Sequence, residues 1–173
     1  MRSIFHSSLI VLALFAGACS SGGGSGRTLN ATGIAPAGPA NQTTISLVSA
    51  AGAGTITVPV ELANRGAASP SAVQFDVGYD TSRLQITAVR VAGNAVGANK
   101  DITVRTSAAQ QKSRIIIFGM NDTALADGLI AEIDFSGIGA PGNVPLSVSK
   151  TLASAGDASL IATAGAGASA TIQ

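Results

Sequence analysis

Hydrophobic and polar residues alternate along most of this chain, and the alternation is clearest from Ser71 to Ile86. The apolar positions of this run are Val73, Phe75, Val77 and Tyr79. Polar or small residues fill the positions between them, a pattern typical of a strand with one buried and one solvated face. Asp80-Thr-Ser follows with side chains that favour a turn, and the alternation resumes at Leu84. The pattern predicts a central strand and a tight corner around which the core forms.

Shorter runs of the same kind recur on both sides of this strand. The other predicted strands are 44–48, 55–63, 102–106, 114–120, 129–136 and 144–148, and 158–162 with 168–172 predicts a last hairpin. After Arg114, the run to residue 120 is continuously apolar, which predicts a strand covered on both faces. No segment has a convincing helical period. The predicted fold class is therefore all-β, a two-sheet jelly-roll β-sandwich of about nine strands.

Two positions predict irregularities in these strands. Pro59 has no amide hydrogen to donate, so its strand is expected to lie at a sheet edge or to carry a bulge there. After Ile86, the apolar parity slips between Ala88 and Val89 or Val91, which predicts either another bulge or a strand buried on both faces.

The composition suits one such domain and excludes one class of partner. Of 173 residues, 11 % are charged and 3 % are aromatic, so Thr, Ser, Asn, Gln and Gly must supply most of the solvated surface. The formal net charge is +1, and it becomes 0 once Arg2 is removed with a leader, because nine of the ten basic residues then remain against nine acidic ones. A balanced net charge lacks the excess of basic residues that is typical of proteins that bind nucleic acid.

Residues 1–18 have the pattern of an export signal. An apolar run from Leu9 to Phe15 is followed by small residues and then by Cys19, the only cysteine. This order resembles the bacterial lipobox, in which cleavage leaves a cysteine that is then acylated, although Ala16 stands where Leu is commoner. We expect a lipoprotein signal peptide over 1–18, lipidation of Cys19, and anchoring to the cell envelope, at the outer membrane or cell surface. The alternative is a plain secretory signal with an incidental cysteine.

The chain between this cysteine and the first strand has a different composition. Residues 19–42 are rich in Gly and Ser and then in Ala, Pro, Asn and Thr, which cannot bury a core. We expect a flexible linker over 19–42 and the folded domain over 43–173.

Candidate catalytic groups are sparse. His6 is the only histidine and lies in the leader, so the mature chain has no imidazole for a catalytic triad or a metal site. Glu132 and Asp134 alternate on one strand, about 6.5–7 Å apart by strand rise, which is within the range of paired glycosidase carboxylates. Two acids on a solvated strand face are far more often surface charges, and we interpret them as solvent-facing. Asn121-Asp-Thr with Asp127 lacks the dense acidic pattern of a calcium loop and indicates a polar turn. We expect no enzyme activity and no cofactor.

Several segments together resemble the bacterial cohesin domain in sequence and spacing. They are Gly54-Thr-Ile-Thr-Val-Pro-Val-Glu-Leu, Val73-Gln-Phe-Asp-Val-Gly-Tyr-Asp-Thr-Ser-Arg-Leu-Gln-Ile, Ile116-Ile-Phe-Gly-Met-Asn-Asp, Gly128-Leu-Ile-Ala-Glu-Ile-Asp-Phe and Val144-Pro-Leu-Ser-Val. The most specific is the Phe-x-x-x-Tyr-Asp-x-x-x-Leu corner from Phe75 to Leu84. The resemblance implies a jelly-roll sandwich that binds a dockerin, a small helical module carried by a partner such as a polysaccharide-degrading enzyme. Calcium is then expected on the partner and not on this chain.

The resemblance also implies where the partner binds. In cohesins one flat sheet face makes the contact, and it includes the strand aligned with residues 72–80. The solvent-facing candidates at matching positions are Ala72, Gln74, Asp76, Thr103, Arg105, Asn121 and Asp122. At Ala72 and Gln74 the chain departs from the hydrogen-bonding polar pair that is commoner in the family, which argues against recognition of a conventional dockerin.

Two other functions fit the same composition. Related sandwiches bind carbohydrate directly, although sugar-binding faces usually need stacked aromatic rings, and the alternation assigns Tyr79 to the core. A structural envelope lipoprotein without a dedicated ligand is also compatible with the low charge and the long linker.

Overall fold

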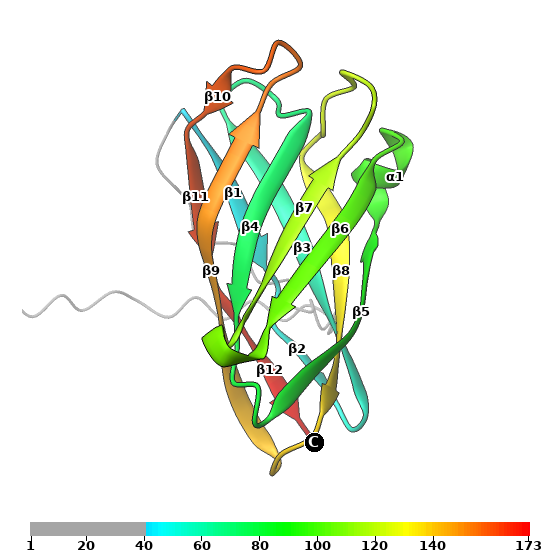
Figure 1. The fold of residues 1–173 in the computed structure, drawn as a ribbon, viewed down its shortest axis with the longest axis vertical. Helices are drawn as coiled ribbons and strands as arrows, with labels where there is room; N and C mark the ends of the chain where they lie inside the picture. Colours follow the sequence, from blue (N-terminus) through cyan, green and yellow to red (C-terminus); the bar gives the residue numbers. More distant parts are fainter. Residues whose placement is uncertain (1–40) are drawn as a thin grey trace, which may run out of the picture. The chain divides into compact units, whose positions relative to one another are not determined.

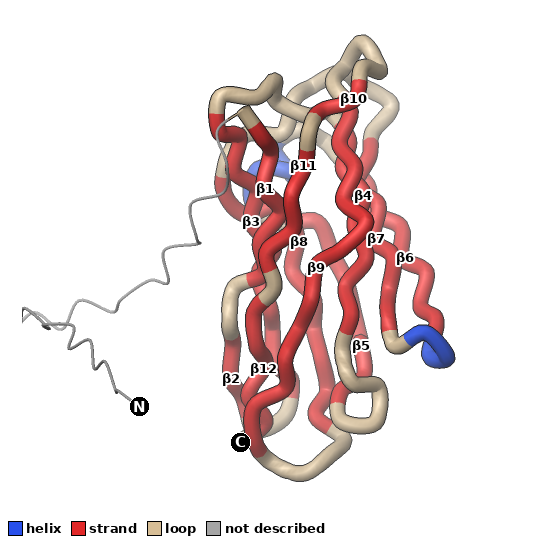
Figure 2. Tube along the Cα trace, turned by 90° about the vertical axis from the view of Figure 1, so that its left-hand side faces the viewer, coloured by secondary structure: helices blue, strands red, loops and turns tan. Residues whose placement is uncertain are grey.

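The computed structural model describes residues 41–173 as two β-sheets packed face to face, as the alternating pattern predicted. The expected signal peptide, Cys19 and the linker up to residue 40 lie outside the described residues. Figure 2 shows the two sheets from the side as two layers. Within the described range, no helix has the length and apolar character needed to cross a bilayer.

The smaller sheet contains five strands in the spatial order β11-β1-β3-β8-β5. Their bounds are β1 (Gln42–Leu47), β3 (Thr55–Arg65), β5 (Leu84–Val91), β8 (Gly128–Gly137) and β11 (Thr163–Ala166). Neighbours pair antiparallel, except that β1 and β11 run parallel.

The larger sheet has the order β2-β12-β9-β4-β7-β6, with the short β10 paired to β9. Its strands are β2 (Ala50–Gly52), β4 (Ala72–Gly78), β6 (Asp101–Ser107), β7 (Lys112–Phe118), β9 (Gly142–Ser154), β10 (Leu160–Ile161) and β12 (Ala168–Ile172). A one-turn helix, α1 (Gly93–Gly97), precedes β6, and a 3-10 turn, η1 (Ala108–Gln110), joins β6 to β7. β4 pairs with β9 on one side and β7 on the other, which confirms the predicted central strand.

The core lies between the two sheets and is formed by the alternating apolar positions of both. Phe75 and Val77 of β4 are fully buried, as are Ile133 and Phe135 of β8. The ring of Tyr79 meets the ring of Phe135 edge to face, with 5.3 Å between their centroids. Since Tyr79 follows β4 and Phe135 belongs to β8, this aromatic contact links the two sheets.

The expected irregularities are present in modified form. β5 shifts register against β8 between Ile86 and Ala88, which confirms a bulge there. β3 is an interior strand and not an edge strand, and it shifts register against β8 between Val60 and Glu61, next to the proline. Pro59 lies where β1 ends, and its carbonyl accepts a hydrogen bond from the Val48 amide at 3.0 Å. The strand pairing between β1 and β3 therefore ends next to Pro59, so no ladder hydrogen bond is lost for want of its amide hydrogen.

Two predictions about the later strands were wrong. β7 alternates between buried and more exposed residues instead of being covered on both faces. The expected last hairpin does not form, because β10 pairs with β9, and β12 pairs with β9 and β2. The chain crosses from one sheet to the other at Gly167, where a Cβ atom would lie 2.3 Å from the Leu146 carbonyl oxygen. Only glycine permits this close approach of two backbones.

Candidate functional site

The outer face of the larger sheet carries most of the residues predicted to bind a partner. The strands β9, β4, β7 and β6 lie side by side in this order, and Figure 1 shows them in front of the smaller sheet. This surface, here termed the open face, is formed by the outward side chains of Ala72, Gln74, Asp76, Thr103, Arg105, Lys112, Arg114, Ile116, Phe118 and Leu152, together with Leu160 of β10. It divides into an apolar half and a cationic half.

The apolar half exposes large hydrophobic side chains at the end of the sheet where β10 lies. Leu160 is 79 % exposed, Leu152 49 % and Phe118 37 %. Ile116 pairs with Gln74, which pairs with Leu152 on its other side. A shallow hollow of about 170 Å³ runs between these strands and is lined by Ala72, Gln74, Ile116, Leu152, Ser154 and Leu160 among others. Adjacent exposed apolar side chains of this size typically mark an interaction site.

A bulge in β9 determines which side chains reach the apolar half. Ser149 lies opposite Asp76 and Leu152 opposite Gln74, so two residues of β9 face one residue of β4. Lys150 adopts a left-handed conformation here, with φ of 49°. Without the extra residue, the alternation that buries Leu146 would also turn Leu152 inward, because a one-residue shift exchanges the two faces of a strand. The bulge therefore places Leu152 on the open face.

The cationic half is built around Asp76. The Arg114 Nε donates to Asp76 Oδ1 at 2.7 Å and its second guanidinium nitrogen, Nη2, donates to Oδ2 at 3.1 Å, while Lys112 Nζ lies 3.6 Å from Oδ2. The Asp76 side chain is 1 % exposed, so the prediction that it faces solvent was wrong. Hydrogen bonds from Arg114 lower the pKa of Asp76 despite its burial, and the charges of Arg114 and Lys112 act in the same direction. Asp76 thus holds Arg114 and Lys112 in place and is covered by them.

The other predicted residues of β4 and β6 do lie together on the open face. Thr103 pairs with Ile116 and Arg105 with Arg114 across the β6–β7 ladder, and both predicted residues are exposed. Ala72 and Gln74 are half-buried on β4. The structure thus brings four predicted residues, Ala72, Gln74, Thr103 and Arg105, to one surface.

Asn121 and Asp122 lie in the loop after β7, away from these ladders. Asn121 is occupied by the fold: its Oδ1 accepts from Lys100 Nζ at 2.9 Å, and its Nδ2 donates to the carbonyls of Ala98 and Asn99, both at 3.3 Å. Lys100 is only 4 % exposed, and burial lowers its pKa. Asp122 is exposed. The expectation of a solvent-facing side chain agrees with the exposed Asp122, whereas Asn121 is half-buried and its polar atoms are bonded within the fold.

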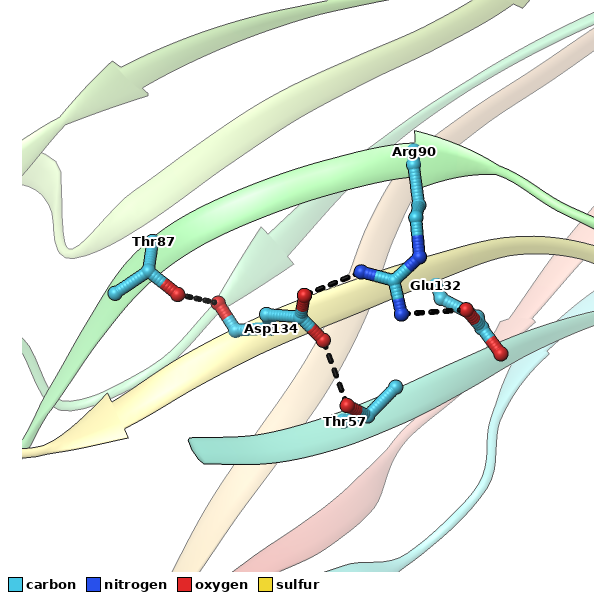
Figure 3. Close-up of polar contacts among 5 residues, drawn as sticks. All are labelled: Thr57, Thr87, Arg90, Glu132 and Asp134. Atoms are coloured by element: carbon cyan, nitrogen blue, oxygen red, sulfur yellow. Dashed lines mark hydrogen bonds and ion pairs between the residues drawn. The ribbon is translucent and has the colours of Figure 1, made fainter. Parts of the chain in front are cut away.

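The outer face of the smaller sheet has a different character. Asp134 of β8 accepts from Thr57 Oγ1 of β3 at 2.7 Å and pairs with Arg90 of β5, which also lies 2.6 Å from Glu132 Oε2 (Figure 3). The Thr57 hydrogen bond and then the Arg90 contact lower the pKa of Asp134. The Glu132 and Asp134 side chains are 28 % and 15 % exposed, so they form partly covered ion pairs across three strands. Within residues 41–173, no three acidic, histidine or cysteine side chains come together as metal ligands.

Comparison with known proteins identifies the family. The sequence model of one protein family, the cohesin domain, matches residues 41–173 of this chain. The chain belongs to the cohesin family. This confirms the family indicated by the Phe75–Leu84 corner and its flanking segments. Cohesin domains are non-catalytic protein-binding modules, in agreement with the prediction that this protein is not an enzyme.

Solved cohesins share the fold at low sequence identity. A cohesin from Clostridium acetobutylicum is 20 % identical with a TM-score of 0.63, covering 78 % of this chain and 92 % of that one. A non-cellulosomal cohesin from the archaeon Archaeoglobus fulgidus is 18 % identical with a TM-score of 0.62, and the match covers 76 % of this chain and 91 % of that one. The cohesin of a type I cohesin–dockerin complex from Clostridium thermocellum is 16 % identical with a TM-score of 0.63, and the match covers 77 % of this chain and 100 % of that one. Homologous cohesins are thus known in complex with dockerins. No curated protein sequence matches the chain.

Several residues of the cohesin open face were not predicted from the sequence. They are Lys112, Arg114, Ile116, Phe118, Leu152 and Leu160. Arg114, Ile116 and Phe118 were missed because the run 114–120 was interpreted as buried on both faces, although buried and more exposed positions alternate along β7. Lys112 was missed because it precedes that predicted strand. Leu152 had no signal in the sequence, because its outward direction depends on the bulge at Lys150.

Proposed function

We propose that the mature protein is an exported, lipid-anchored cohesin that holds a dockerin-type module at the cell envelope. The family supports protein binding, and the order of export signal, Cys19 and linker supports the anchor. The linker enters the domain at Asn41, whose amide donates to the carbonyl of Arg65 at the end of β3. The partner would be held through this domain, with calcium on the partner module.

We assign the contact to the open face. The observation that carries this assignment is the exposure of Leu152, Leu160 and Phe118 around Gln74 and Ile116, on a four-stranded surface that no other described element covers. Burial of such side chains against a partner contributes favourable free energy of about 25 cal/mol per Å² of apolar area. The fold leaves a large part of the Leu152, Leu160 and Phe118 side chains exposed.

Docked enzymes are the most direct use of such an anchor. A dockerin joined to a polysaccharide-degrading enzyme would keep that enzyme beside the cell. Direct binding of polysaccharide is less well supported, because Phe118 is the one aromatic ring exposed on the described domain and Tyr79 is 6 % exposed.

A capture experiment tests the assigned face. Immobilised protein is expected to retain calcium-loaded dockerin modules and to release them when EDTA is added. The pair Gln74→Arg and Leu152→Arg is expected to reduce the affinity at least about 100-fold, because two charges are then desolvated at the centre of the contact. Gln85→Arg, on exposed β5 of the smaller sheet, is the matched control and should retain full capture. Equal loss by both sets of variants would refute the assigned face.

The anchor has a separate test. Mass spectrometry of the membrane fraction should find acyl chains on Cys19, and Cys19→Ser should shift the protein to the soluble exported fraction. An unmodified cysteine on a protein that remains soluble would refute lipidation and support the plain secretory signal.

A further inference from the structure

The cationic half of the open face carries more positive than negative charge. Arg105, Lys112 and Arg114 surround a single carboxylate, that of Asp76, at a hollow of about 320 Å³ that Thr106, Ser107 and Gln110 also line. Among the described residues, no second carboxylate forms an ion pair with these three cations. The hollow therefore has two positive charges in excess.

Arg105 carries one of the two excess charges, and the other is shared by Arg114 and Lys112 around Asp76. Arg114 places two of its nitrogens on Asp76, and Lys112 lies beside the same carboxylate. Arg105 forms no ion pair or side-chain hydrogen bond with any described residue, and it lies directly across the β6–β7 ladder from Arg114. Like charges in directly opposite positions destabilise a sheet. The free domain thus contains a repulsive pair that an added anion would relieve.

We propose that this hollow receives a carboxylate side chain of the docked protein, with Arg105 as its main ligand. The inference rests on the proposed function, and it specifies the chemistry of the partner. Arg114 and Ile116 are two residues apart on the same face of β7, which corresponds to about 6.6–6.8 Å. Side chains one turn apart on a helix are separated by about 5–6 Å. A partner helix with an apolar residue and an Asp or Glu at positions i and i+4 would therefore reach both halves of the open face.

The free protein provides the first test, and it needs no partner. Arg105→Gln is expected to raise the melting temperature by about 1–2 °C in 20 mM NaCl, and the gain should vanish in 500 mM NaCl. Arg90→Gln removes the same charge from the smaller sheet, where Arg90 pairs with Glu132 and Asp134, so it should lower the melting temperature. A decrease for Arg105→Gln at low salt would overturn the proposal, since Arg105 would then be held by the fold.

Binding provides the second test. The dockerin captured by the wild type should bind Arg105→Gln at least about 10-fold more weakly in 20 mM NaCl and bind Arg90→Gln within about 2-fold of the wild type. If the wild type captures a dockerin and Arg105→Gln leaves the affinity unchanged, the carboxylate site is wrong while the proposed function stands.

A third measurement applies even if no dockerin binds, in which case the proposed function fails on its own. Two Ala-rich helical peptides, with Leu and Glu or Leu and Lys at i and i+4, are titrated while side-chain and amide NMR signals of Arg105 and Ile116 are recorded. The Glu peptide should shift these signals in the wild type and not in Arg105→Gln, and the Lys peptide should shift neither. Equal effects of the two peptides, or no effect of either, would overturn the proposal.

Discussion

The two outer faces of this sandwich both carry arginines and carboxylates, but the side chains are paired within the chain on one face and only partly paired on the other. On the smaller sheet, Thr57, Arg90, Glu132 and Asp134 bond to one another across three strands (Figure 3). On the larger sheet, Asp76 is enclosed by Arg114 and Lys112, Arg105 has no counter-ion among the described residues, and large apolar side chains remain in water. Polar groups that are satisfied within the chain stabilise the fold, whereas unsatisfied groups beside exposed apolar area indicate a surface completed by another molecule.

The largest effect expected from a single change concerns the core shared by both faces. Phe135→Ala should lower the free energy of unfolding by about 3–5 kcal/mol, because a fully buried ring that contacts Tyr79 is replaced by a cavity. Urea denaturation measures this loss. Phe118→Ala is the matched control: its ring lies on the open face, and the change should cost less than about 1 kcal/mol. Similar losses for the two variants would contradict the division into core and open face.

Removing the central carboxylate of each face should have unequal results. Asp76→Asn should cost about 1–2 kcal/mol, because it leaves Arg114 and Lys112 without the charge that holds them. Asp134→Asn should cost less, since Arg90 keeps Glu132 as a partner. The measurement is again urea denaturation at neutral pH. A greater loss for Asp134→Asn would show that the smaller sheet depends more on its charges.

The same two carboxylates should make the fold sensitive to acid. The folded-state pKa of Asp76 lies below the ordinary value of 3.8, mainly because Arg114 donates hydrogen bonds to the ionised form. Its contribution is therefore present above about pH 4 and is lost as the pH falls through the lowered folded-state pKa. The wild type should lose more stability than Asp76→Asn between pH 5 and pH 2. Parallel pH profiles for the two proteins would contradict the depressed pKa.

The smallest effect is expected at the edge of the polar network. Glu132→Gln should change the free energy of unfolding by less than about 0.5 kcal/mol, because a partly exposed ion pair contributes little in water. Thermal denaturation with the wild type measured alongside it provides the check. A loss above about 1.5 kcal/mol would show that Glu132 has a structural role that its contacts do not reveal.

Regular alternation was enough to predict the fold and the central strand. Each apolar position of β4 faces the core, and the turn residues after Tyr79 end the strand as expected. The slip in parity after Ile86 also predicted a real bulge. These features depend on neighbours in sequence, which the alternation records directly.

The candidate site was harder to predict, because its properties depend on strand pairing. Asp76 is buried because Arg114, 38 positions away, lies opposite it in the β4–β7 ladder, and alternation contains no information on that register. Leu152 faces outward because Lys150 takes a left-handed conformation, which its residue type does not demand. The last hairpin was wrong for the same reason, since β12 pairs with β2 and β9, which precede it in sequence, and not with the neighbouring β10.

A methyl NMR titration with a calcium-loaded dockerin tests the central claim most directly, because it reports on both faces in one experiment. The methyl signals of Ile116, Leu152 and Leu160 should shift as the dockerin is added, while those of Thr57, Thr87 and Ala88 on the smaller sheet should stay unchanged. Shifts confined to Thr57, Thr87 and Ala88 would contradict the assignment of partner binding to the open face.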